Sequence, residues 1–167
     1  MKRRIIDDQP HDAKSKKEDP LIDMLIMLEQ CSSIVDYAIK LELRRFGVNI
    51  PQVKILTMLS REDRPLTIDE ISNWSLREFN SVSTLINKME KDGLIKKTKR
   101  NGDTKTYITL TKEGANLYNH EITERSIHLI FNSLSADERT QLHDLLKKVR
   151  DITRDILGID FKPPFLP

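Results

Sequence analysis

Several residue types are scarce in this chain of 167 residues, and each scarcity excludes a class of protein. The single cysteine, Cys31, cannot form an internal disulfide, and an oxidising compartment would favour more cysteines in a chain of this size. The chain has only five glycines, and 38% of its residues are hydrophobic and 32% charged. This composition indicates a helix-rich chain rather than a doubly wound nucleotide-binding sheet. No apolar run approaches the roughly 18 residues of a membrane-spanning helix.

Excess charge and a secretion signal are lacking too. With 28 basic and 26 acidic residues, the net charge is only +2, so any argument for an acidic partner depends on how the charges are distributed. The basic residues Lys2, Arg3 and Arg4 are not followed by the apolar block of a signal peptide. We therefore expect a single soluble domain in the cytoplasm.

Both ends of the sequence differ from its middle. Residues 1–18 mix charges of both signs without an apolar period, which predicts a disordered charged arm; a basic arm that follows DNA is the alternative. Residues 161–167 contain three prolines and form a predicted extended, Pro-rich tail. The apolar side chains of Phe161, Phe165 and Leu166 suggest that this tail docks on a neighbouring surface.

A long first helix is predicted from Asp19-Pro20, a cap followed by proline, to about Arg45. Its apolar residues spread over two faces, so we expect it to be covered on two sides. Gly47 is suited to the C-terminal cap, and Asn49 to the cap of the next helix, about residues 51–59.

Two predicted capping boxes then follow eight residues apart, Thr67-x-x-Glu70 and Ser75-x-x-Glu78. They predict helices over about 68–73 and 76–92, the second ended by Gly93. Two short helices joined by a tight turn form a helix-turn-helix.

Strands are predicted next, over residues 94–100 and 105–110 around Asn101-Gly102, which is a strong hairpin signal. Thr111 is predicted to cap another helix, and Ser135-x-x-Glu138 to open the last one, about 136–157. Apolar residues repeat along that last helix with a spacing typical of long partner helices. The predicted dimerisation residues are Leu142, Leu145, Leu146, Val149, Ile152 and Ile156.

The second helix of the pair has two distinct faces at 100° per residue. Phe79, Val82, Leu85, Ile86 and Met89 form an apolar side, and the opposite side carries amides, hydroxyls and cations suited to base edges and phosphates. The predicted contacts to base edges are Asn80, Ser81, Ser83, Thr84 and Asn87. The predicted contacts to phosphates are Arg77, Lys88, Lys91, Lys97 and Lys99. The predicted minor-groove contacts, made by the wing, are Arg100 and Lys105. The alternatives are a solvated helix face and a basic strand edge that only opposes aggregation.

These motifs, in order and spacing, resemble the winged-helix region of the MarR family of transcription regulators. The resemblance is carried by Leu66-Thr67-Ile68-Asp69-Glu70-Ile71, by Ser81-Val82-Ser83, by Met89-Glu90-Lys91-Asp92-Gly93-Leu94-Ile95 and by Leu110-Thr111-Lys112-Glu113-Gly114. It implies a homodimer on a pseudo-palindromic double-stranded DNA operator and repression relieved by a small molecule or an oxidant. The chain differs from the family pattern in two places. In the wing, Asp103-Thr104-Lys105 stands where the family often has Asp-x-Arg. In the second helix, Thr84 stands where many members have arginine.

The sequence therefore predicts a mainly α fold: a winged helix-turn-helix with a two-stranded β-hairpin wing at residues 50–110, flanked by helical dimerisation regions at 19–46 and 112–160. The predicted function is that of a sequence-specific DNA-binding repressor. A winged-helix module that binds proteins without specific DNA binding is the alternative. No catalytic set, cofactor or metal site is predicted, because the histidines do not converge and Cys31 in mid-helix is typical of a small core residue.

Overall fold

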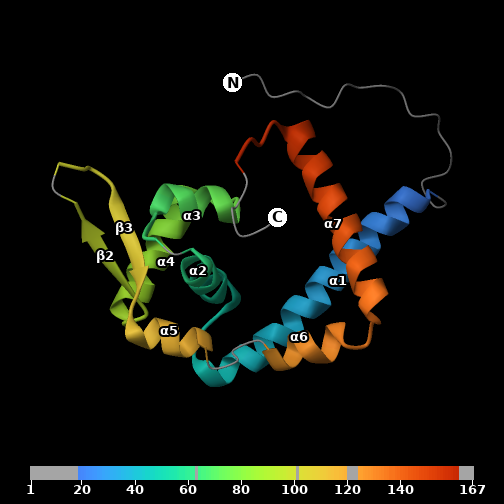
Figure 1. Cartoon of the computed structure of the whole chain (residues 1–167), viewed down its shortest axis with the longest axis horizontal. Coiled ribbons are helices and arrows are strands. Elements are labelled where there is room, and N and C mark those ends of the chain that lie inside the picture. Colours follow the sequence, from blue (N-terminus) through green and yellow to red (C-terminus); the bar gives the residue numbers. More distant parts are fainter. Residues whose placement is uncertain (1–18, 63, 101, 120–123, 162–167) are drawn as a thin grey trace. The chain divides into compact units, whose positions relative to one another are not determined.

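The computed structural model describes residues 19–62, 64–100, 102–119 and 124–161 (Figure 1). Contacts divide the chain into two compact units. The helical unit contains described residues up to Ile39 and from Ile127 to Asp160, and the winged-helix unit contains Lys40 to Ser126 together with Phe161. The predicted arm, residues 1–18, and residues 162–167 of the predicted tail lie outside the described residues.

The helical unit is built from most of α1 (Pro20–Leu43), most of α6 (Glu124–Phe131) and α7 (Ala136–Leu157). The Asp19 carboxylate accepts a hydrogen bond from the Leu21 N–H at 2.9 Å, as expected for a cap. At α7, Ser135 and Glu138 form the predicted capping box, and Gly158 ends the helix in the left-handed conformation. The predicted starts of both long helices are confirmed.

The winged-helix unit begins where α1 ends in a short 3₁₀ turn, Arg44–Phe46. Gly47 closes this turn with a φ of 66°, a conformation that favours glycine. Asn49 and Gln52 then form a reciprocal capping box at the start of α2 (Ile50–Arg61). The cap at Asn49 and the break at Gly47 are confirmed.

The sheet of this unit has three antiparallel strands in the order β1–β3–β2, whereas the sequence predicted a two-stranded hairpin. The hairpin of β2 (Ile95–Lys99) and β3 (Thr106–Leu110) pairs Ile95 with Leu110 and Lys99 with Thr106. The extra strand, β1 (Leu66–Thr67), pairs Leu66 with Ile108. Two residues carry no readable strand period, which explains why the sequence did not predict β1.

The helix-turn-helix consists of α3 (Ile68–Ser75) and α4 (Phe79–Lys91), and Thr67 and Glu70 form the predicted box at its start. The box predicted at Ser75 is wrong. Ser75 is the last residue of α3, and its hydroxyl donates to the Ile71 carbonyl at 2.7 Å. The N-cap of α4 is Glu78, whose side chain makes no capping hydrogen bond, so α4 begins three residues later than predicted.

A buried apolar core joins these elements. It includes Leu56 of α2, Leu66 of β1, Ile71 of α3, Ile86 and Met89 of α4, and Ile108 of β3, each with no exposed surface. This core fixes α4 against the sheet, and the β2–β3 hairpin extends away from the helices of its unit (Figure 1). α4 and the β2–β3 hairpin are therefore held by one packed body.

The next helix, α5 (Lys112–Asn119), packs against α2 and belongs to the winged-helix unit. Thr111 caps it as predicted: its hydroxyl accepts from the Gly114 N–H at 3.0 Å and donates to the Gly93 carbonyl at 2.6 Å. A dimerisation role for residues 112–160 remains a prediction, and α5 is the part of that range that packs on the winged helix.

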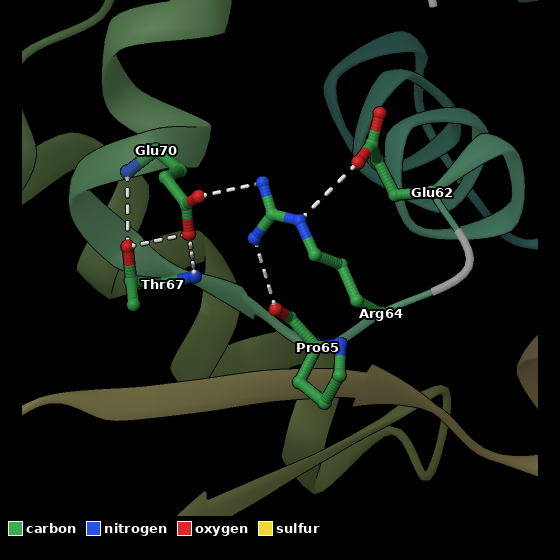
Figure 2. A network of polar contacts seen from close by, with 5 residues as sticks. All are labelled: Glu62, Arg64, Pro65, Thr67 and Glu70. Atoms are coloured by element: carbon green, nitrogen blue, oxygen red, sulfur yellow. Dashed lines mark hydrogen bonds and ion pairs between the residues drawn. The ribbon is translucent and has the colours of Figure 1, made fainter. Parts of the chain in front are cut away.

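Arg64 connects the end of α2 to the start of α3 (Figure 2). Its guanidinium lies 2.8 Å from a Glu70 carboxylate oxygen and 3.5 Å from Glu62. The other Glu70 oxygen accepts from the Thr67 N–H at 2.8 Å and from the Thr67 hydroxyl at 2.9 Å. Partial burial opposes ionisation of Glu70, but the hydrogen bonds from Arg64 and Thr67 outweigh it and lower the pKa of this carboxyl.

The start of the predicted C-terminal tail docks as the sequence suggested for Phe161, whereas Phe165 and Leu166 lie outside the described residues. The Phe161 ring stacks on the Trp74 ring of α3, with 5.6 Å between the ring centroids. Phe161 thereby joins the edge of the core. Among the helices of the described chain, none is both long and apolar enough to cross a membrane.

Candidate nucleic-acid interface

The inner face of α4 is set by the core beneath it. Val82, Ile86 and Met89 are buried and Leu85 is half-buried, as the helical period predicts. Phe79 differs from the prediction, because 47% of its surface is exposed. It is the first residue of α4, and the core does not extend to it.

The outer face of α4 is exposed and carries polar and basic side chains. Its exposed members are the predicted contacts Arg77, just before the helix, and Asn80, Ser81, Thr84, Asn87, Lys88 and Lys91. Ser83 is half-buried. The Thr84 hydroxyl donates to the Asn80 carbonyl at 2.9 Å, so its proton is used within the helix and its oxygen can still accept.

Lys97 connects the wing to α4. Its ammonium lies 2.8 Å from a Glu90 carboxylate oxygen and also donates to the Asn87 side-chain oxygen. The Lys97 N–H donates to the other Glu90 oxygen at 3.2 Å. The hydrogen bond from Lys97 lowers the pKa of the Glu90 carboxyl. Lys97 thus supports the contact between β2 and α4.

The tip of the wing is organised around Tyr107. The Arg100 guanidinium lies over the Tyr107 ring at 4.2 Å from its centroid. The Tyr107 hydroxyl donates to Asp103 at 2.6 Å, and the Lys105 N–H donates to the other Asp103 oxygen at 2.9 Å. Hydrogen bonding to Tyr107 lowers the pKa of Asp103 and raises that of Tyr107. Arg100 and Lys105 are therefore held at one tip, both exposed, as is Lys99 at the end of β2. Asn101 lies outside the described residues.

Three supporting residues of this surface were not predicted from the sequence: Tyr107, Asp103 and Glu90. An aromatic residue beside basic residues in a hairpin is a signal for a cation–π contact. The sequence could not say which cation it would hold, because that choice depends on the loop between the strands. Glu90 carried no signal, since an exposed helical carboxylate is ordinary.

The predicted dimerisation residues form an exposed apolar row on α7. Within α7, all of which the structure describes, no residue is buried. Exposed fractions in this row run from 36% at Leu142 to 63% at Leu145. The structure thus brings Leu142, Leu145, Leu146, Val149, Ile152 and Ile156 to the surface of this chain.

The remaining candidate residues are scattered. Cys31 is exposed on α1, in contrast to the buried position expected for a core cysteine. His128 and His143 are exposed, and His120 lies outside the described residues. In the part of the chain that the structure describes, no three His, Cys, Asp or Glu side chains gather where they could hold a metal ion.

A helix-turn-helix whose second helix exposes a polar, basic face beside an antiparallel wing defines the winged-helix class of DNA-binding domains. Within that class, residues 48–107 match the family model described as MarR family. This region is therefore similar to the MarR family of transcription regulators, the family that the motifs indicated.

Individual proteins agree with this assignment. Over 71 residues the chain is 38% identical to the homoprotocatechuate degradative operon repressor of Escherichia coli, a match that covers 41% of this chain and 48% of that protein. The chain thus spans about half the length of the curated relatives it matches.

Solved structures share the fold. The ligand-free organohalide-sensing regulator RdhR-CbdbA1625 has a TM-score of 0.73 at 23% identity, covering 90% of this chain and 89% of that chain. The MepR–DNA complex of S. aureus has a TM-score of 0.69 at 23% identity, covering 75% and 95%. At these identities the similarity concerns the fold alone.

Proposed function

We propose that this protein is a sequence-specific double-stranded-DNA-binding transcription regulator that acts as a homodimeric repressor. One observation carries the proposal: the exposed face of α4, with its amides, hydroxyls and cations, adjoins a wing tip where Arg100 is held over Tyr107. Amides and hydroxyls suit base edges, and cations suit phosphates. The solved MepR–DNA complex among its structural neighbours supports the same interpretation.

In the proposed complex, α4 enters the major groove and the wing follows the backbone to the neighbouring minor groove. Asn80, Ser81, Ser83, Thr84 and Asn87 would then meet base edges. Phosphates would be met by Arg77, Lys88, Lys91, Lys99 and, after release from Glu90, Lys97. Arg100 and Lys105 at the wing tip are the residues proposed for the minor groove. Because Glu90 already pairs with Lys97, this lysine should contribute less to binding than the cations that have no ion pair among the described residues.

Dimerisation is supported by the apolar row on α7. Burying one leucine side chain stabilises an interface by about 1.5–3 kcal/mol, so a continuous row of six exposed apolar residues favours a partner surface of the same kind. Two copies related by a two-fold axis would present two α4 helices to a pseudo-palindromic operator.

The first experiment measures binding of the purified protein to the DNA upstream of its own coding region, with random DNA as competitor, across a salt series. Tight, competitor-resistant binding that weakens with salt is expected. Weak binding that is equal on random DNA would instead favour a winged-helix module that binds a protein.

The wing is tested by replacing Arg100 and Lys105 with Ala together. If each side chain neutralises one phosphate, the slope of log K against log salt should flatten by about 0.9 for each phosphate that is no longer neutralised. Lys54→Ala, which removes an exposed lysine of α2, is the matched control and should leave the slope unchanged. An unchanged slope in the double variant would remove Arg100 and Lys105, and with them the wing tip, from the proposed interface.

Release by a small molecule or an oxidant is the last part of the proposal. One structural neighbour was solved with 2,4-dichlorophenol bound, which makes this phenol a first ligand to add to the protein–DNA complex. Hydrogen peroxide tests oxidant release, with Cys31→Ser as the control because the Cys31 thiol is exposed. A complex that survives both additions would count against release by these two agents.

A further inference from the structure

Two large apolar side chains are exposed at the entrance to α4: Leu76 at 68% and Phe79 at 47%. Leu76 is also the one described residue other than glycine with a positive φ, 51°. The Arg77 N–H bonds to the Ser72 carbonyl and the Leu76 N–H to the Asn73 carbonyl, a helix ending that glycine usually closes. Leu76 therefore occupies a strained position without burying its side chain, so packing in this chain does not explain it.

By helical period Phe79 belongs to the core-facing side of α4, 20° from the buried Ile86. The core does not extend to this first residue of the helix, so its ring stays exposed at the N-terminal end of α4. The predicted base contacts Asn80 and Ser81 follow it directly in the same turn. Recognition helices place their N-terminal residues against base edges, so an exposed ring at this end of α4 is within reach of a base in the proposed complex.

Thymine offers an apolar group at that place. In the major groove, thymine is the one base that carries a methyl group. Apolar side chains such as phenylalanine contact this methyl group. Exposed Arg77 beside the two apolar residues favours a phosphate-bearing partner over an apolar protein surface. The geometry points to Phe79, flanked by Leu76, as a specificity-determining residue that recognises thymine by its methyl group. This inference rests on the proposed DNA-binding function and adds the class of base contacted.

The test compares thymine with uracil, which lacks only the methyl group. The probe is a duplex that the wild-type protein binds with competitor resistance, taken from its own upstream region or selected from random DNA. Each thymine is replaced in turn by deoxyuridine. We expect affinity to fall about four-fold at one or two positions per half-site, the effect of burying one methyl-sized group.

Phe79→Ala should bind the thymine duplex more weakly and lose the distinction between thymine and uracil at those positions. Phe79→Leu keeps an apolar side chain and should restore part of that distinction. Asn80→Ala is the matched control: it removes a neighbouring predicted base contact without an apolar group, so it should weaken both duplexes equally. Because Phe79 is half exposed, thermal unfolding of the variants should match the wild type.

The outcomes separate the two proposals. A wild-type protein that selects no duplex would overturn the DNA-binding function and this inference with it. A protein that binds DNA specifically but binds uracil and thymine duplexes equally, or whose preference for thymine persists in Phe79→Ala, would keep the proposed function and overturn the role of Phe79. Capture of a protein partner that depends on Phe79, together with equal binding to thymine and uracil DNA, would reassign the apolar pair to that partner.

Discussion

At the scale of single residues, Gly114 determines how closely α5 approaches the sheet. A Cβ atom at this position would lie 2.0 Å from the Leu94 carbonyl oxygen and 3.0 Å from the Leu94 carbonyl carbon. Both are backbone atoms, which cannot move aside as a flexible side chain can. Thr111, which caps α5, ties the same helix to the Gly93 carbonyl. The approach of the two backbones therefore requires glycine.

Replacing Gly114 with Ala should destabilise the protein by about 1–3 kcal/mol, because α5 must shift away from Leu94 and loosen its packing on α2. Urea unfolding followed by circular dichroism measures this as a lower midpoint. Glu113→Ala is the control, since Glu113 is exposed on the same helix. Equal midpoints for the two variants would contradict the argument.

Site residues differed in how far the sequence could predict them. The outer face of α4 follows from helical period alone, since Val82, Ile86 and Met89 must point inward. The ion pair of Lys97 and the exposure of Phe79 could not be predicted in this way. Whether a lysine forms an ion pair depends on neighbours, such as Glu90, that come near it only in the folded chain. Whether a phenylalanine in the first turn of a helix is covered depends on the folded chain in the same way.

At the scale of elements, helix starts were predictable where the cap is a local hydrogen bond. Asn49, Thr67 and Ser135 each accept from the backbone N–H three residues later. Ser75 has the same spacing to Glu78, yet Leu76 takes the left-handed conformation and ends α3 there. A glycine at position 76 would have indicated that α3 ends there, whereas the leucine at this position gives no such signal.

The contact between Arg64 and Glu70 adds a pH dependence to the start of α3. The pKa of Glu70 is lowered in the folded chain from its ordinary value of 4.5, so its stabilisation is present above that pH and is lost as the pH falls towards the folded value. Glu70→Gln keeps a side chain that can complete the capping box but removes the charge. The variant should be less stable than the wild type at pH 7, by less than about 1 kcal/mol because Arg64 is half exposed.

Urea unfolding of both proteins between pH 7 and pH 3 measures this difference, which should shrink as the pH falls. Arg64→Gln removes the partner and should show the same convergence with the wild type. A difference between the Glu70→Gln variant and the wild type that is independent of pH would mean that the carboxylate acts through its shape rather than its charge.

The C-terminal segment offers a separate test through the stack of Phe161 on Trp74. Phe161→Ala should lower stability by about 0.5–1.5 kcal/mol for the missing ring pair, in addition to the effect of reduced burial. Because Trp74 is the only tryptophan, its fluorescence reports the change as emission at longer wavelength from a more hydrated ring. Phe161→Leu, which keeps apolar bulk, should show a smaller shift. An unchanged emission spectrum in Phe161→Ala would contradict docking of this segment in solution.

At the scale of the whole molecule, the two units differ in how they bury apolar surface. The core residues of the winged-helix unit are covered by its own elements. In the helical unit, α1 has exposed apolar residues such as Leu21, Met24 and Ile34, and α7 exposes its apolar row. The two-faced pattern of α1 and the repeat of α7 were readable from the sequence. Whether a second copy covers these residues was not readable, because a sequence does not say whether a partner helix belongs to the same copy.

Leu145→Asp tests that question at the most exposed residue of the α7 row. If two copies bury this row, the substitution places an unpaired carboxylate in an apolar interface, and the cost should convert the dimer to monomers at micromolar concentration. Thr140→Asp is the matched control, since Thr140 is exposed on the opposite side of α7, about 170° from the middle of the row at 100° per residue. Light scattering coupled to gel filtration distinguishes the two masses.

The folded state of the variant separates dissociation from unfolding. The winged-helix unit has its own core, so Trp74 emission in Leu145→Asp should stay that of a folded protein while the mass halves. Affinity for a two-half-site duplex should then fall much more than affinity for a single half-site, because only the former uses two α4 helices at once. A Leu145→Asp protein that remains dimeric would move the proposed interface away from α7, and a monomeric wild type would overturn the homodimer itself.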